Sequence, residues 1–116
     1  MNTLVKSLCC LGLFAGSISA AQIQGVLMDK SCSSKAVSGG QKAAASHDRE
    51  CALAPACQKS GYGVFTSDGK WLSFDEAGNK QALVALNASK KADNLKVTVT
   101  GDVQGDIIKV TDLKLN

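Results

Sequence analysis

The chain has 116 residues, of which 13 are Lys or Arg and 10 are Asp or Glu, with a formal net charge of +3. The basic residues are scattered along the sequence, which argues against the clustered basic face of a nucleic-acid-binding protein. A chain of this length predicts one folded domain.

The N-terminal end has the three parts of a secretory signal peptide, which we assign to residues 1–21. Lys6 supplies the positive charge, residues 8–18 form an apolar run, and small residues follow up to Ala21. The apolar run is well short of the roughly 20 residues that a membrane-spanning helix needs. We therefore expect cleavage near Ala21 and a periplasmic or secreted domain of residues 22–116, with no membrane insertion after cleavage.

Removal of this segment changes the cysteine count. Cys9 and Cys10 leave with it, so five cysteines become three, and 12 basic residues remain against 10 acidic ones. A domain of this size buries only about 60–65% of its unfolded surface. A disulfide or metal ion that staples the fold would therefore be useful.

The first strand is predicted at residues 22–29, where Gly25 marks a bulge or a close approach of another backbone. Residues 31–40 are rich in Ser and Gly and predict a loop, and the alanine-rich residues 41–46 predict a helical turn. These segments are the first half of an insert at residues 30–60.

The second half of the insert carries helix signals. Asp48 is a suitable N-cap for a short helix at residues 49–53, because its carboxylate can accept from an orphan N–H. Pro55 disfavours continuation of that helix and can begin a second turn, which stops at Gly61.

Beyond the insert the pattern predicts strands. Residues 62–66 and 70–74 flank Asp68-Gly69, a strong hairpin signal. Residues 75–79 predict a turn, and residues 80–88 predict one amphipathic helix.

The C-terminal segment predicts two more strands, residues 95–103 and 107–115, with a change of phase near Asp112 that indicates a bulge. The order of elements is that of a small, mainly β, five-stranded OB-fold-like barrel. It has one short helix between strands 3 and 4 and a Cys/His-bearing insert after strand 1. Another five-stranded α+β sheet is the alternative.

The remaining cysteines, Cys32, Cys51 and Cys57, are disulfide candidates, because an exported domain meets an oxidising compartment. Loop entropy gives roughly 3.5 kcal/mol for a Cys32–Cys57 link. Pairing of Cys32 with either partner is open at this point, and each pairing leaves one thiol over.

A metal site is the second interpretation of the same residues. His47 and Cys51 are four residues apart, and with Cys32 and Cys57 they make a Cys₃His set suited to zinc or, through its thiolates, to copper.

A redox or nucleophilic cysteine is the third interpretation, with Cys51 near a helix N-terminus and His47 one turn before it. The chain has no C-x-x-C motif and no second histidine, so we do not expect an enzyme. Among the few aromatic residues, Tyr62 and Trp71 are candidates for a ligand surface, although core packing is the simpler role.

Several short motifs carry a resemblance: Gly25-x₃-Asp29-x₂-Cys32, His47-x₃-Cys51-x₅-Cys57 and Gly61-Tyr62-Gly63-Val64. With these motifs the chain resembles a group of small exported bacterial proteins of unassigned function, and its tail resembles periplasmic OB-fold proteins of the stress-associated type. The resemblance implies an OB-like barrel with a Cys/His insert.

The expected function is that of a monomeric, non-enzymatic binding or structural module, with a protein or small ligand as partner and its insert stapled by a disulfide. Alternatives are a zinc or copper protein and a thiol redox protein.

Overall fold

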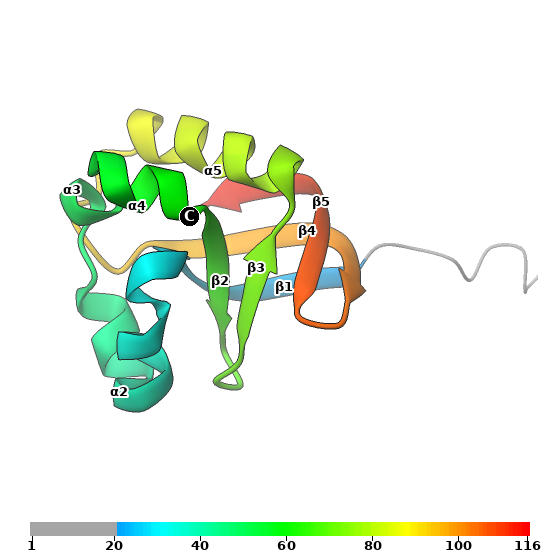
Figure 1. Cartoon of the computed structure of the whole chain (residues 1–116), viewed down its shortest axis with the longest axis horizontal. Helices are drawn as coiled ribbons and strands as arrows, with labels where there is room; N and C mark the ends of the chain where they lie inside the picture. The colour runs from blue at the N-terminus through cyan, green and yellow to red at the C-terminus, as the bar shows by residue number, and fades with distance from the viewer. Residues whose placement is uncertain (1–20) are drawn as a thin grey trace, which may run out of the picture.

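The computed structural model describes residues 21–116, so residues 1–20 of the predicted signal peptide lie outside the described part (Figure 1). The strands are β1 (Ala21–Asp29), β2 (Tyr62–Thr66), β3 (Trp71–Phe74), β4 (Lys96–Gln104) and β5 (Ile107–Leu115). The helical elements are η1 (Lys30–Cys32), α2 (Ser33–Ser46), α3 (Arg49–Ala52), α4 (Pro55–Ser60) and α5 (Glu76–Ala88). Within this described range, no helix is long and apolar enough to cross a membrane.

The five strands form a closed ring in the order β1-β2-β3-β5-β4, because β1 pairs with both β2 and β4. All neighbours are antiparallel except β3 and β5, which run parallel where Ser73 lies opposite Ile107. The predicted five strands, and the helix between the third and fourth, are confirmed. Figure 1 shows α5 lying across one end of the ring beside α4, while α2 hangs outside it.

The helix content is higher than the sequence predicts. Helices make up 42% of the described residues, so the protein is mixed α/β and not mainly β as predicted. The helix between β3 and β4 and a helical part of the insert after β1 were both predicted, but the insert is helical over most of its length. The predicted loop at residues 31–40 belongs mostly to α2, which is kinked at Gly40 (φ 76°). Ala36 and Ala44 of α2 are fully buried, so packing compensates for a composition that by itself favours a loop.

α5 also begins earlier than predicted. The Asp75 side chain accepts a hydrogen bond from Gly78 N at 3.0 Å and caps the helix, so residues 76–79 are helical and not a turn. The capping free energy offsets the low helix propensity of Gly78 and Asn79.

Two apolar clusters explain why the end of β1 is buried on both faces. Leu27 points into the main cluster, which includes Val64 of β2 and Leu86 of α5. Its neighbours Val26 and Met28 point the other way, into a smaller cluster beneath α2. Successive strand residues face opposite sides, so α2 covers the outer face of β1 and packs the insert against the ring.

Two predictions are confirmed: the close backbone approach at Gly25 and the bulge near Asp112. A Cβ at Gly25 would lie 2.2 Å from the carbonyl oxygen of Phe65, so the two backbones approach too closely for any side chain. In the β4–β5 pair, Thr100 lies opposite Asp112 and Gly101 opposite Val110. Thr111 is therefore the extra residue of a bulge beside Asp112.

Candidate functional site

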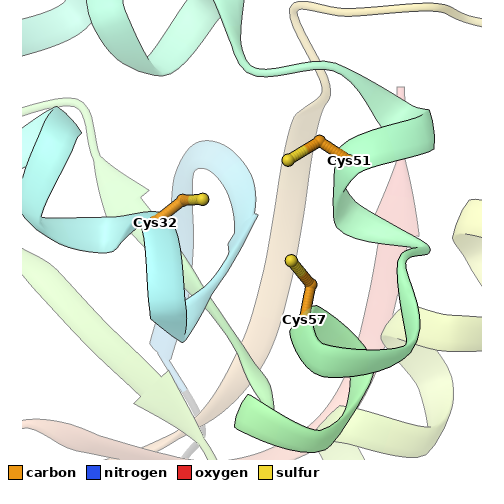
Figure 2. Close-up of side chains that lie close together, drawn as sticks. All are labelled: Cys32, Cys51 and Cys57. Atoms are coloured by element: carbon orange, nitrogen blue, oxygen red, sulfur yellow. The ribbon is translucent and has the colours of Figure 1, made fainter.

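Three thiols from three separate elements converge between the ring and the insert. Cys32 ends η1, Cys51 lies in α3 and Cys57 lies in α4. Figure 2 shows the three side chains pointing toward a common space. Their sulfur atoms all lie within 4.8 Å of one another. Each residue is partly buried and each is a free thiol.

Local hydrogen bonds fix the two short helices that carry Cys51 and Cys57. Asp48 Oδ1 accepts from Cys51 N at 2.7 Å and begins α3, as predicted. Pro55 is the first residue of α4 and Gly61 (φ 84°) follows its last, also as predicted. Helices this short are not stable alone, so their positions depend on contacts with the ring.

Tyr62 supplies one such contact. This residue of β2 is 2% exposed, and its hydroxyl donates to the carbonyl oxygen of Ala52 at 2.7 Å. Since Ala52 follows Cys51 directly, the bond ties the thiol-bearing helix to the strand ring. Burial, with a smaller contribution from the Asp29 charge, raises the pKa of Tyr62 to about 12.

A buried carboxylate and imidazole lie beside the thiols. His47 Nε2 donates to Asp29 Oδ1 at 2.7 Å, and the two residues are 9% and 0% exposed. The other oxygen of Asp29 accepts from Ser31 Oγ and, at 3.2 Å, from Cys32 N. Asp29 therefore links the end of β1 to η1 and to the first residue after α2.

Burial by itself raises the pKa of Asp29, but the hydrogen bonds from His47 and Ser31 outweigh it and hold the pKa well below its ordinary value. The carboxylate is consequently ionised at neutral pH although it is shielded from water. It places a fixed negative charge next to the thiols.

The surroundings of Cys32 and Cys51 favour the protonated form of these two thiols. Burial, followed by the negative charge of Asp29, raises the pKa of Cys32. Burial and the nearby Cys32 raise the pKa of Cys51 to about 11. A nucleophilic cysteine needs a lowered pKa, and the pKa values of Cys32 and Cys51 are raised instead.

The site has an opening to solvent. A cavity of about 210 Å³ is lined by residues of β1, α2 and α3, among them Met28, Lys35, His47 and Cys51. Cys51 is the one thiol residue that lines it, so a small ion can approach the site from the side of Cys51.

The predicted Cys₃His set divides into two groups that share one residue. Cys32, Cys51 and Cys57 form the first, and Asp29, Cys32 and His47 form the second; each has its donor atoms within 4.8 Å and could hold a metal ion. His47 thus joins Cys32 but is not part of the three-thiol group.

Asp29 stands in the motif Gly25-x₃-Asp29-x₂-Cys32, but the sequence analysis did not include it among the candidate site residues. The signal was available, because this acid lies three residues before Cys32 and directly follows the apolar residues 26–28 of β1. Its partnership with His47, 18 residues away, depends on the path of α2 and could not be predicted from spacing.

The two aromatic residues predicted for a ligand surface differ in their exposure to solvent. Tyr62 is a core residue, whereas Trp71 is half-buried and donates through its indole N–H to Ser73 Oγ at 3.1 Å. Of the two, Trp71 alone offers part of its ring to solvent.

No family model, no curated protein and no solved structure matches this chain.

Proposed function

We propose that this protein is an exported, monomeric, non-enzymatic domain that binds one thiophilic metal ion, zinc or copper, through Cys32, Cys51 and Cys57. The observation that supports it is the convergence of these sulfur atoms, from three elements, within 4.8 Å of one another. Three thiols have no comparable reason to meet at one point if they only fill space.

The separation suits coordination. Zinc–sulfur bonds of about 2.3 Å in a tetrahedral site place the sulfur atoms about 3.8 Å apart. From an upper bound of 4.8 Å, each separation needs to shorten by about 1 Å at most. Rotation of the cysteine side chains on their short helices accomplishes a movement of this size.

We further propose that the strand ring is an OB-like barrel. Five strands with a helix between the third and fourth are typical of that fold. The barrel then serves as a rigid support, and the insert between its first two strands carries the ion. Membership of the small exported bacterial proteins that the motifs resemble fits this proposal.

The test is the metal content of the reduced protein. After incubation with excess Zn²⁺ or Cu(I) under anaerobic conditions and desalting, we expect one metal ion per chain for at least one of the two metals. Cys32→Ser, Cys51→Ser and Cys57→Ser should each lower the retained metal at least tenfold.

Val37→Ser is the matched control, because it introduces the same side chain at an exposed position of the insert. It should bind as the unmodified protein does, and circular dichroism should show that all variants fold. Wild-type protein that retains no metal, or serine variants that retain a full equivalent, would refute the proposal.

A second candidate function is supported by the same convergence. Oxidation of two of the three thiols would staple the insert to β1 and leave one thiol, as expected for a disulfide-stapled binding module. Cys32 paired with Cys51 or with Cys57 both fit this candidate. Thiol counting without reduction separates it from the metal proposal.

A further inference from the structure

We infer that the ion is Cu(I), held in a three-coordinate shell made only of the sulfur atoms of Cys32, Cys51 and Cys57, with Asp29 and His47 outside that shell. This inference rests on the proposed metal-binding function and names its ligand. It differs from a zinc site in its coordination number and in the absence of a nitrogen or oxygen ligand.

The donor set is the first argument. The group around the common space in Figure 2 consists of three sulfur donors. Soft thiolates select Cu(I) among the ions available to proteins, although they also suit zinc. Zinc in a structural site takes four protein ligands, and this group supplies three.

The second argument is that the nearest oxygen and nitrogen donors already form hydrogen bonds with other groups. Asp29 Oδ1 and His47 Nε2 hold each other at 2.7 Å, and Asp29 Oδ2 accepts from Ser31 Oγ and Cys32 N. A metal ion bound by either of these atoms would have to break a buried, charge-assisted hydrogen bond, which is among the stronger contacts in a protein.

The thiol sulfur atoms make weaker hydrogen bonds than Asp29 and His47 do. Ser31 Oγ lies 3.5 Å from Cys57 Sγ and, because its one proton goes to Asp29, it can only accept a weak hydrogen bond from this thiol. The sulfur atoms can therefore turn toward an ion at small cost, while the Asp29–His47 pair stays intact and orients Cys32 through its backbone N–H.

The third argument is that apolar side chains pack against one side of the site. Met28 is fully buried and lines the same small cavity as Cys51 and His47. Cys32 packs against the apolar cluster that contains Met28 and Phe65. This apolar side of the site offers no oxygen or nitrogen ligand, as a shell made only of sulfur requires.

A positive side chain at the opening of the cavity offsets part of the negative charge of the site. Lys35 lines the cavity, and its ammonium partly neutralises the three thiolates that form when the thiols release their protons to water on binding.

The experiment combines competition with spectroscopy. The reduced full-length protein is loaded with one equivalent of Cu(I) under anaerobic conditions, and its copper X-ray absorption spectrum gives the number and kind of ligands. The expected shell has three sulfur atoms and no nitrogen or oxygen. A parallel sample loaded with Zn²⁺ is titrated with Cu(I), and one equivalent should displace the zinc.

His47→Gln is the discriminating variant and Val37→Ser is its control. Val37 is exposed on α2, away from the sulfur atoms, so this change should leave the spectrum unchanged. The copper shell of His47→Gln should also keep three sulfur atoms, whereas loss of a nitrogen ligand would overturn the inference.

The outcomes of these experiments distinguish the Cu(I) inference from the proposed metal-binding function on which it rests. A zinc ion bound at one equivalent with a fourth ligand, and not displaced by Cu(I), would overturn the copper inference and leave the metal-binding function standing. A protein that binds neither ion would overturn both. If His47→Gln fails to fold, the spectrum of the unmodified protein still decides the coordination shell.

Discussion

At the scale of single residues, Asp29 determines the geometry of the site without being one of its thiols. It is fully buried and accepts hydrogen bonds from His47, Ser31 and the backbone of Cys32. A buried charge is tolerated only when such partners compensate its lost hydration. Replacement of Asp29 therefore tests both the fold and the orientation of the thiols.

Asp29→Asn should weaken metal affinity about 10- to 100-fold, the usual effect of removing a partner that orients a ligand. It should also lower the free energy of unfolding by about 1–3 kcal/mol, because a charged hydrogen bond is lost in a buried place. Competition with a chelator and urea denaturation measure the two effects. Asp112→Asn, an exposed carboxylate on β5, should change neither; equal effects of the two variants would contradict this role.

Tyr62 provides a pH prediction. It is the only tyrosine of the chain, and burial raises its pKa to about 12, compared with about 10 when exposed. The native protein should therefore show a tyrosinate absorbance change with a midpoint near pH 12. The stabilising contribution of the protonated phenol is complete below about pH 10 and is lost as the pH rises toward 12.

Tyr62→Phe should remove this alkaline dependence, so that stability falls less steeply above about pH 10 than in the unmodified protein. At neutral pH the variant should be about 1–2 kcal/mol less stable, because the buried carbonyl of Ala52 loses its donor. A native titration midpoint near 10 would show that Tyr62 is not buried in the folded protein.

At the scale of elements, the sequence predicts best where a local chemical rule determines the structure. Asp68-Gly69 forms the hairpin turn with Gly69 at φ 87°, and Pro55 and Gly61 bound α4. Asp48 caps α3. Each of these features depends on contacts within a few residues.

The helix α2 shows where local rules fail. Its Ser- and Gly-rich first half has little helix propensity, and burial of Ala36 and Ala44 against β1 and β2 stabilises it. The pairing of Asp29 with His47 fails to be predicted for the same reason, since it exists only after α2 has packed.

Asp75 tests the connection between an element and the ring. Its Oδ1 accepts from Gly78 N at 3.0 Å and from Val110 N at 3.2 Å, so it both caps α5 and contacts β5. Asp75→Ala should lower the free energy of unfolding by about 2 kcal/mol, more than a surface substitution. The control is Asp93→Ala in the exposed linker. Equal denaturation midpoints for the two variants would contradict the double role.

At the scale of the whole molecule, the apolar core and the thiol site lie in different parts of the fold. The main apolar cluster joins the strand ring to α5, whereas the thiols lie on short helices of the insert. The ring therefore has its own source of stability, and the insert depends on contacts with the ring and on the ion that we propose it binds. Which residues bear the chemistry was predictable from residue type, but their grouping depends on this three-dimensional arrangement.

Metal removal should consequently act locally. We expect amide hydrogen exchange to accelerate at least tenfold in residues 30–60 of the metal-free protein, with little change in β4 and β5. Exchange followed by mass spectrometry, with and without the ion, measures this. Acceleration throughout the ring would show that the ion holds the whole fold together.

The central claim is that three reduced cysteines hold one ion, and thiol counting on protein isolated without added reductant tests it most directly. The protein is denatured with chelator, alkylated without reduction, and its intact mass is measured. Three labels per mature chain are expected, together with none when the folded, metal-loaded protein is alkylated first. A single label after denaturation would show one disulfide and one free thiol, and would contradict the metal-binding account.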